Sequence, residues 1–161
     1  MSIKEKQDFQ TFLDSNSIEY PKDEKEASDL IKKFYQKGDP VELIGLGTKR
    51  AIGKPLQCSK ILSLSKLNEI VEYLPEELYI KVQAGTPIKK IEEKLRENNQ
   101  QLAFEPIDFG YLLNGKSNPG TAAGQVACNI SGPRRLKVGS VRDHVLGFRG
   151  VNGKGGIIKS G

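Results

Sequence analysis

The chain has 161 residues, of which 37% are hydrophobic, and its mean hydropathy is −0.46. This length indicates about one domain with a real core, and the composition indicates neither a membrane-spanning nor a disordered protein. The two cysteines, Cys58 and Cys128, stand far apart in the sequence. This argues against a disulfide scaffold and against zinc or iron–sulfur ligation, so we expect no metal site. The N-terminus lacks the apolar core of a signal peptide, so we expect a cytoplasmic protein without a membrane span.

The positive charge is gathered at one end of the chain. Of the 25 Lys and Arg residues, seven lie within residues 131–161 beside a single acidic residue, whereas the first 130 residues are close to neutral. Such a surplus suggests a polyanionic partner: a nucleic acid, lipid headgroups or a phosphate-bearing cofactor. A nucleic-acid surface would carry aromatic residues among its charges for base stacking, and residues 131–161 contain only Phe148.

The first half of the chain predicts alternating helices and strands. Residues 1–28 are rich in charged and polar residues and are expected to form a polar extension. A helix is predicted from Ser28, as N-cap, to Gly38. The alternating residues from Val41 predict a strand that runs into a turn at Gly45 and Gly47.

Further elements follow in the middle of the chain. An apolar stretch covers residues 61–64, apolar residues at helical spacing predict a helix over 67–74, and alternation predicts a strand over 78–82. Thr86 and Pro87 predict a helix start, with a hydroxyl N-cap and proline at the first helical position. Ile88, Ile91 and Leu95 form its buried stripe, and residues 101–104 predict a short strand. This order is typical of an α+β or α/β domain.

The amino-acid composition changes after residue 106. Gly, Pro, Ala, Ser and Asn dominate residues 110–139, and no regular period is visible there. Long irregular segments inside a compact domain are usually functional or disordered. The composition leaves both interpretations open.

Two glycine-containing segments could carry chemistry. Residues 45–50 (GLGTKR) follow a predicted strand, where glycines let backbone N–H groups approach a phosphate and Lys49 and Arg50 supply charge. The spacing fits neither the Walker pattern nor GxGxxG, and a plain turn would look much the same. Small residues at 121–127, with SGPRR and GSVRD behind them, allow a flat ligand or another backbone to approach. An ordinary surface loop is the alternative for this second region.

The titratable residues offer no catalytic group. His144, the only histidine, stands beside Asp143, which invites a general-base role. Without a nucleophile in a motif, a structural role for His144 is favoured. We therefore predict no catalytic residue.

Taken together, the segments GLGTKRAIGKP, VQAGTPIKKIEEKL, QQLAFEP, SGPRR and GSVRDHVLGFRGVNGKG resemble the FAD-binding domain of the vanillyl-alcohol oxidase and p-cresol methylhydroxylase (PCMH) type. SGPRR joined to GSVRDHVLG is similar, more narrowly, to the FAD-binding E subunits of glycolate oxidases. The resemblance covers roughly residues 29–161 and implies an α+β fold of two subdomains that clasp FAD. The first subdomain would extend to about residue 75 and the second would start at about residue 76. Family members continue well beyond the motif at 150–161, so we expect a chain truncated within the cofactor domain.

The resemblance also implies the site residues. Loop 45–49 would cradle the FAD pyrophosphate, with Leu46 where members usually have glycine, and residues 121–124 would match a Thr-x-Gly-Gly contact with alanine in place of one glycine. The loop has no histidine or cysteine for covalent attachment, so non-covalent FAD is implied. The implied cofactor-binding residues are Gly45, Leu46, Gly47, Thr48, Lys49, Thr121, Ala123, Gly124, Ser131, Gly132, Gly139, Ser140, Asp143 and Ile157.

The function implied is that of an FAD-dependent oxidoreductase subunit. It would oxidise glycolate to glyoxylate within a complex that contains a homologous FAD-linked D subunit and an iron–sulfur F subunit, in the cytoplasm or peripherally at the inner face of the plasma membrane. An FAD-linked D-lactate-type dehydrogenase is the alternative. A basic nucleic-acid-binding module is the second alternative, although we expect no nucleic-acid partner.

Overall fold

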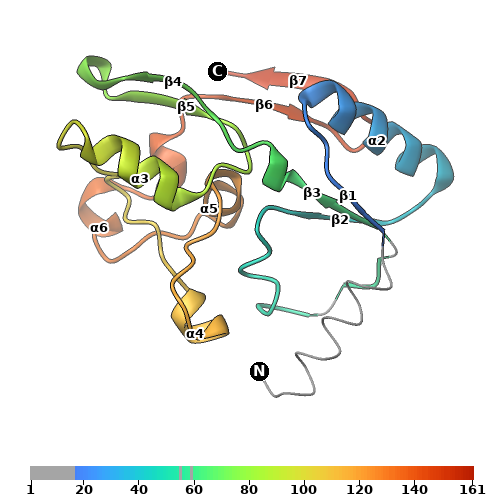
Figure 1. Ribbon diagram of the computed structural model, residues 1–161, viewed down its shortest axis with the longest axis horizontal. Helices are drawn as coiled ribbons and strands as arrows, with labels where there is room; N and C mark the ends of the chain where they lie inside the picture. The colour runs from blue at the N-terminus through green and yellow to red at the C-terminus, as the bar shows by residue number, and fades with distance from the viewer. Residues whose placement is uncertain (1–16, 55, 59) are drawn as a thin grey trace.

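The computed structural model describes residues 17–54, 56–58 and 60–161 and confirms a mixed α+β architecture (Figure 1). The strands are β1 (Ser17–Glu19), β2 (Val41–Ile44), β3 (Lys60–Ser63), β4 (Ile70–Leu74), β5 (Tyr79–Val82), β6 (Phe148–Val151) and β7 (Ile157–Ser160). The helices are α2 (Glu24–Lys37), α3 (Ile88–Arg96), α4 (Gly110–Asn114), α5 (Ala122–Cys128) and α6 (Arg135–Val138). Short 3-10 turns lie at η1 (Leu64–Lys66), η2 (Pro75–Glu77) and η3 (Val141–His144).

A parallel three-stranded sheet organises the N-terminal part. Its order is β1-β3-β2, and β3 pairs in parallel with both neighbours. As the central strand, β3 buries its two consecutive apolar residues, Ile61 and Leu62, almost completely. Because the strands are parallel, their carboxyl ends share one edge, and the glycine segment at 45–49 leaves the sheet at that edge.

Helix α2 lies between this sheet and the β6–β7 hairpin (Figure 1). The Asp23 side chain accepts from the backbone N–H of Glu26 and is the N-cap, so the predicted start at Ser28 is wrong. Ser28 is buried inside the helix, and its hydroxyl donates to the Gly155 carbonyl at 2.6 Å. The predicted end at Gly38 is confirmed, since this residue takes the left-handed conformation at φ 68°.

Part of the expected polar extension forms regular secondary structure within the described residues. Strand β1 and the first turn of α2 lie within residues 17–28, whereas the rest of the extension, residues 1–16, lies outside the described residues. The pairing of β1 with β3 brings this segment into the sheet.

An antiparallel hairpin of β4 and β5 replaces a predicted helix. The strand predicted over 78–82 is confirmed by β5, but the helix predicted over 67–74 is wrong, because residues 70–74 pair with β5. The β-branched Ile70 and Val71 favour an extended backbone, which the pairing with β5 completes. The hairpin crosses the subdomain boundary expected near residue 75, which stays a prediction.

Helix α3 forms the main hydrophobic cluster. Ile88, Ile91 and Leu95 are buried as predicted, and residues of β4, β5 and α5 pack against them. The predicted hydroxyl cap is wrong, because Thr86 donates its hydroxyl to the Glu69 carbonyl at 3.1 Å and Pro87 occupies the N-cap position.

The strand predicted over 101–104 is also wrong. A turn covers residues 103–104, and the positive φ of 50° at Glu105 interrupts an extended backbone. The irregular segment at 110–139 contains the short helices α4, α5 and α6. Within the described parts of the chain, no helix has the length and apolarity needed to cross a bilayer.

Candidate cofactor-binding site

The glycine loop, residues 45–49, follows β2 at the carboxyl edge of the parallel sheet, where open α/β sheets commonly bind ligands. Gly47 has a φ of 66°, a conformation that glycine adopts without strain. Among the described residues, the backbone N–H groups of residues 46–49 donate to no protein acceptor. The loop therefore offers a row of available donors. Hydrogen bonds from Arg50 N to Gly47 O and from Ile52 N to Lys49 O fix the conformation of the chain where it leaves the loop.

The second small-residue segment lies directly against this loop. A Cβ added to Gly45 would stand 2.3 Å from the Thr121 hydroxyl oxygen, and one added to Gly120 would stand 2.8 Å from that of Thr48. The Lys49 ammonium donates to the Pro119 carbonyl at 3.4 Å. The structure thus brings the predicted residues 45–49 and 121–124 together, and the close approach of the Thr121 side chain to the backbone requires glycine at position 45.

Lys49 supplies a partly buried positive charge beside the loop donors. Burial lowers its pKa, while the charges of Cys128 and Asp108 act in the opposite direction. Within the described residues, its hydrogen bond to Pro119 is long and leaves donor capacity on the ammonium. A desolvated cation next to unpaired N–H groups suits an anionic ligand.

The start of helix α5 has a structural role. The N–H groups of Ala122 and Ala123 donate to the carbonyls of Thr86 and Ala84, at 2.9 and 3.0 Å. The Thr121 side chain accepts from Gly124 N at 3.3 Å as the N-cap. Because these donors are already paired, the glycine loop is where we find free donors for an anion at this place in the described part of the chain.

Two residues that the sequence patterns did not single out hold the segment between Pro106 and α5. Gln125 is fully buried and donates its amide to the carbonyls of Ile107 and Pro119, at 3.0 and 2.7 Å. Asp108 accepts from Gly110 N, Asn118 N and the Ser117 hydroxyl. Asp and Ser in a glycine-rich segment are a signal for such turns.

The hydrogen bonds to Asp108 also set its ionisation. Burial acts to raise the pKa of Asp108, but the hydrogen bonds from Ser117, Gly110 and Asn118 outweigh it and lower that pKa below its ordinary value. The carboxylate form is therefore the one that holds Pro119 and Gly120 beside Thr48 and Lys49.

The third predicted group forms a cluster of its own. Ser131 accepts from Val141 N at 2.9 Å, and Asp143 accepts from the N–H and the hydroxyl of Ser140. These bonds lower the pKa of Asp143. A Cβ on Gly139 would stand 3.0 Å from a carboxylate oxygen of Asp143. Helix α5 contacts η3, so the cluster adjoins the far end of that helix.

Gly132 joins this cluster to the preceding turn. Its N–H donates to the Glu105 carbonyl at 2.9 Å, and an added Cβ would stand 2.7 Å from the Glu105 carboxylate. His144 places Nε2 2.9 Å from the Val138 carbonyl and packs its ring beside Phe104. Both residues thus make structural contacts.

Ile157 lies apart from the other predicted cofactor-binding residues, on strand β7. It belongs to β7, whose hairpin is held to α2 by the hydrogen bond between Ser28 and Gly155 and by the Arg149–Glu24 ion pair. Its side chain is about half exposed. Among the described residues, no hydrogen bond or ion pair connects it to the glycine loop.

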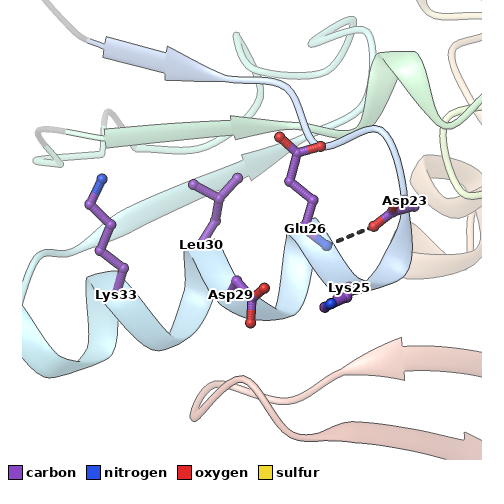
Figure 2. A pocket seen from close by; sticks show the side chains of 6 residues that line it. All are labelled: Asp23, Lys25, Glu26, Asp29, Leu30 and Lys33. Atoms are coloured by element: carbon purple, nitrogen blue, oxygen red, sulfur yellow. Dashed lines mark hydrogen bonds between the residues drawn. The ribbon is translucent and has the colours of Figure 1, made fainter.

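Two surface pockets differ in chemical character. The first, about 410 Å³, runs along α2 and is lined by Asp23, Lys25, Glu26, Asp29, Leu30 and Lys33. Figure 2 shows these side chains spread along the helix, with Glu26, Leu30 and Lys33 on one side and Lys25 on another. Mixed charges that do not converge are typical of a solvated helix face.

The second pocket, about 340 Å³, lies at the carboxyl edge of the sheet. Its lining combines residues 45–48 of the glycine loop with Tyr20, Ser63, Ser65 and Asn118. This pocket is the better candidate site, because it adjoins the unpaired N–H groups and joins elements from both parts of the chain.

The chain is similar to known FAD-linked proteins. Residues 16–161 match the family model described as FAD binding domain. The chain is 37% identical over 122 residues to the glycolate oxidase subunit GlcE of Escherichia coli, covering 76% of this chain and 33% of that protein. It is 28% identical over 142 residues to a D-lactate dehydrogenase of Archaeoglobus fulgidus, covering 88% of this chain and 30% of that one.

A solved structure shows the same fold. p-Cresol methylhydroxylase with substrate bound superposes with a TM-score of 0.65 at 20% identity, covering 89% of this chain and 27% of that chain. This chain spans about a third of the length of the curated relatives named above. The chain belongs to the family of FAD binding domains, and it shares its fold with p-cresol methylhydroxylase.

Proposed function

We propose that the protein binds FAD non-covalently, with the pyrophosphate against the glycine loop. The observation that carries this proposal is the row of unpaired N–H groups at residues 46–49 beside the partly buried ammonium of Lys49. Backbone donors and a fixed positive charge are what a pyrophosphate requires. The loop contains neither histidine nor cysteine, which supports non-covalent binding.

The other predicted residues would support FAD binding indirectly. Thr121 caps α5 by accepting from Gly124 N, and the Ala123 N–H donates to the Ala84 carbonyl, so these residues would hold the first turn of α5 in place. The cluster of Ser131, Gly132, Gly139, Ser140 and Asp143 would shape the flavin side through its backbone, since the side chains of Ser131, Ser140 and Asp143 are already hydrogen-bonded. Ile157 would approach the cofactor only from the hairpin on α2.

The proposed reaction is oxidation of a 2-hydroxy acid, with glycolate as substrate and glyoxylate as product. The 37% identity to a glycolate oxidase subunit supports it. When bound, the flavin would supply the redox chemistry, and this chain would bind and orient it. We propose that the protein acts in the cytoplasm as one subunit of a complex with a homologous FAD-linked subunit and an iron–sulfur subunit.

A substrate comparison on the whole purified complex tests the reaction. Anaerobic addition of glycolate should bleach the flavin absorbance, and D-lactate at equal concentration should bleach it more slowly. Faster bleaching with D-lactate would support the alternative suggested by the D-lactate dehydrogenase likeness. Bleaching by neither acid would contradict the proposed substrate class.

A pair of glycine variants tests the cofactor site. Gly47→Trp should abolish FAD binding, because the indole would cover the loop donors. Gly38→Trp is the matched control, since Gly38 has a φ of 68° against 66° for Gly47 and lies at the end of α2. Both variants carry the same backbone strain, so stoichiometric FAD retained in Gly47→Trp would refute the loop assignment.

A further inference from the structure

Strand β2 buries a carboxylate where a hydrophobic side chain is usual. Glu42 is 7% exposed, whereas its neighbours Val41 and Leu43 are 36% and 61% exposed. Since a strand alternates its faces, the inner face of β2 presents this charge to the interior. Burial of a carboxylate is strongly unfavourable unless it is paired.

Arg50 is the partner of this carboxylate. Its Nε donates to one Glu42 oxygen at 2.6 Å and its Nη2 donates to the other at 2.5 Å. The side chain of Arg50 is 14% exposed, so the pair is largely shielded from water. A bidentate contact fixes the orientation of both side chains as well as their distance.

The ion pair connects the strand before the glycine loop to the residue that follows the loop. Glu42 stands on β2 before the loop, and Arg50 follows the loop directly. The Arg50 backbone N–H donates to the Gly47 carbonyl at 3.2 Å, and a Cβ on Gly47 would stand 3.4 Å from Arg50 Cδ. The arginine stem thus runs along the loop and returns to the strand from which the loop departs.

We propose that the Glu42–Arg50 pair is a positioning device that holds the glycine loop in the conformation that binds phosphate. The proposal rests on the proposed function for its ligand. Replacing a buried ion pair by apolar residues of similar size is often neutral for stability, and a pair of this kind can instead select one conformation. Removing it should therefore affect the loop more than the fold.

A direct phosphate contact is the competing role for Arg50, which also lines the pocket at the carboxyl edge. The two roles differ in what Glu42→Gln does. If Arg50 touched the phosphate directly, loss of the competing carboxylate would leave FAD affinity unchanged or increase it. If the pair positions the loop, the same change weakens FAD binding.

The test uses Glu42→Gln, the apolar double variant Glu42→Leu with Arg50→Met, and the control Glu69→Gln, which removes a carboxylate from the exposed pair with Lys90. Amide exchange without ligand is measured at Ile52, whose N–H donates to Lys49 O. We expect exchange about tenfold faster in both Glu42 variants and unchanged in the control. FAD titration should show binding about tenfold weaker in both.

The outcomes separate this proposal from the proposed function. Unchanged exchange at Ile52 in the double variant would overturn the positioning role, and so would FAD binding in Glu42→Gln as tight as in the parent. If Glu42→Gln does not fold, the exchange at Ile52 in the double variant without ligand decides. A parent that binds no FAD but shows the expected change in exchange would refute the proposed function and leave the positioning of the loop supported.

Discussion

Gly45→Ala should destabilise the protein because the added methyl group meets a side chain that cannot move away. The new Cβ would stand 2.3 Å from Thr121 Oγ1 and 2.9 Å from Thr121 Cγ2, both closer than ordinary contact at roughly 3.5 Å. Thr121 is 3% exposed and caps α5. Overpacking costs about 1–3 kcal/mol, and a lost N-cap costs about 1 kcal/mol.

The expected loss in the free energy of unfolding is therefore about 2–4 kcal/mol, a large part of the roughly 5–15 kcal/mol that a domain has. Urea unfolding followed by circular dichroism measures it. Gly153→Ala is the control, because no atom lies within 4 Å of its added Cβ, and it should stay within about 0.5 kcal/mol of the parent.

A second substitution identifies the clash. Thr121→Ala removes the two atoms nearest to the new methyl group, so the double variant with Gly45→Ala should lose less stability than the two single variants added together. A Gly45→Ala midpoint equal to that of the parent, or strictly additive losses, would refute the close contact between the two segments.

Three further results are expected. Because the pKa of Asp108 is lowered, its carboxylate stabilises the fold above pH 3.8, its ordinary pKa, and this contribution is lost as the pH falls through the lower pKa of the folded state. In an acid titration, the stability of Asp108→Asn should therefore decline less steeply than that of the parent. Identical curves for the two proteins would argue against the hydrogen-bonded carboxylate. Burial and the Glu42 charge raise the pKa of the Cys58 thiol, so iodoacetamide at neutral pH should label exposed Cys128 first, as peptide mass spectrometry can check, and equal labelling would contradict this. The hydrogen bond from Arg149 lowers the pKa of Glu24, so stability present above pH 4.5 should fall on acidification, and Arg149→Met should lose that dependence in thermal melts at stepped pH.

Local patterns predicted those parts of the fold whose causes are local. Gly38 ends α2 because glycine accepts a left-handed conformation, and the stripe of Ile88, Ile91 and Leu95 is buried because its spacing matches a helix. The strand before Gly45 was predicted from alternation in the same way.

The errors occurred where distant residues decide the structure. The apolar spacing of residues 67–74 fits a helix, but Tyr73 pairs with Ile80 across a hairpin. Thr86 followed by Pro87 is a typical start of a helix. However, the Thr86 hydroxyl donates to the Glu69 carbonyl, and the segment 121–122 packs onto the same turn. Short apolar runs do not distinguish these cases.

The candidate site shows the same division. The glycine loop was visible as a pattern, whereas its contact with Thr121 joins residues far apart in the chain and could be expected only through the family resemblance. The sequence did not predict the Glu42–Arg50 pair, because a charged residue in a short strand is usually exposed to solvent.

The most direct test of the account is amide hydrogen exchange of the protein with and without saturating FAD. The N–H groups of residues 46–49, which have no acceptor among the described residues, should exchange rapidly alone and slowly with FAD. The N–H groups of Ala122 and Ala123 are already paired and should change much less. Protection that appears elsewhere and leaves residues 46–49 unchanged would contradict the placement of the pyrophosphate on the glycine loop.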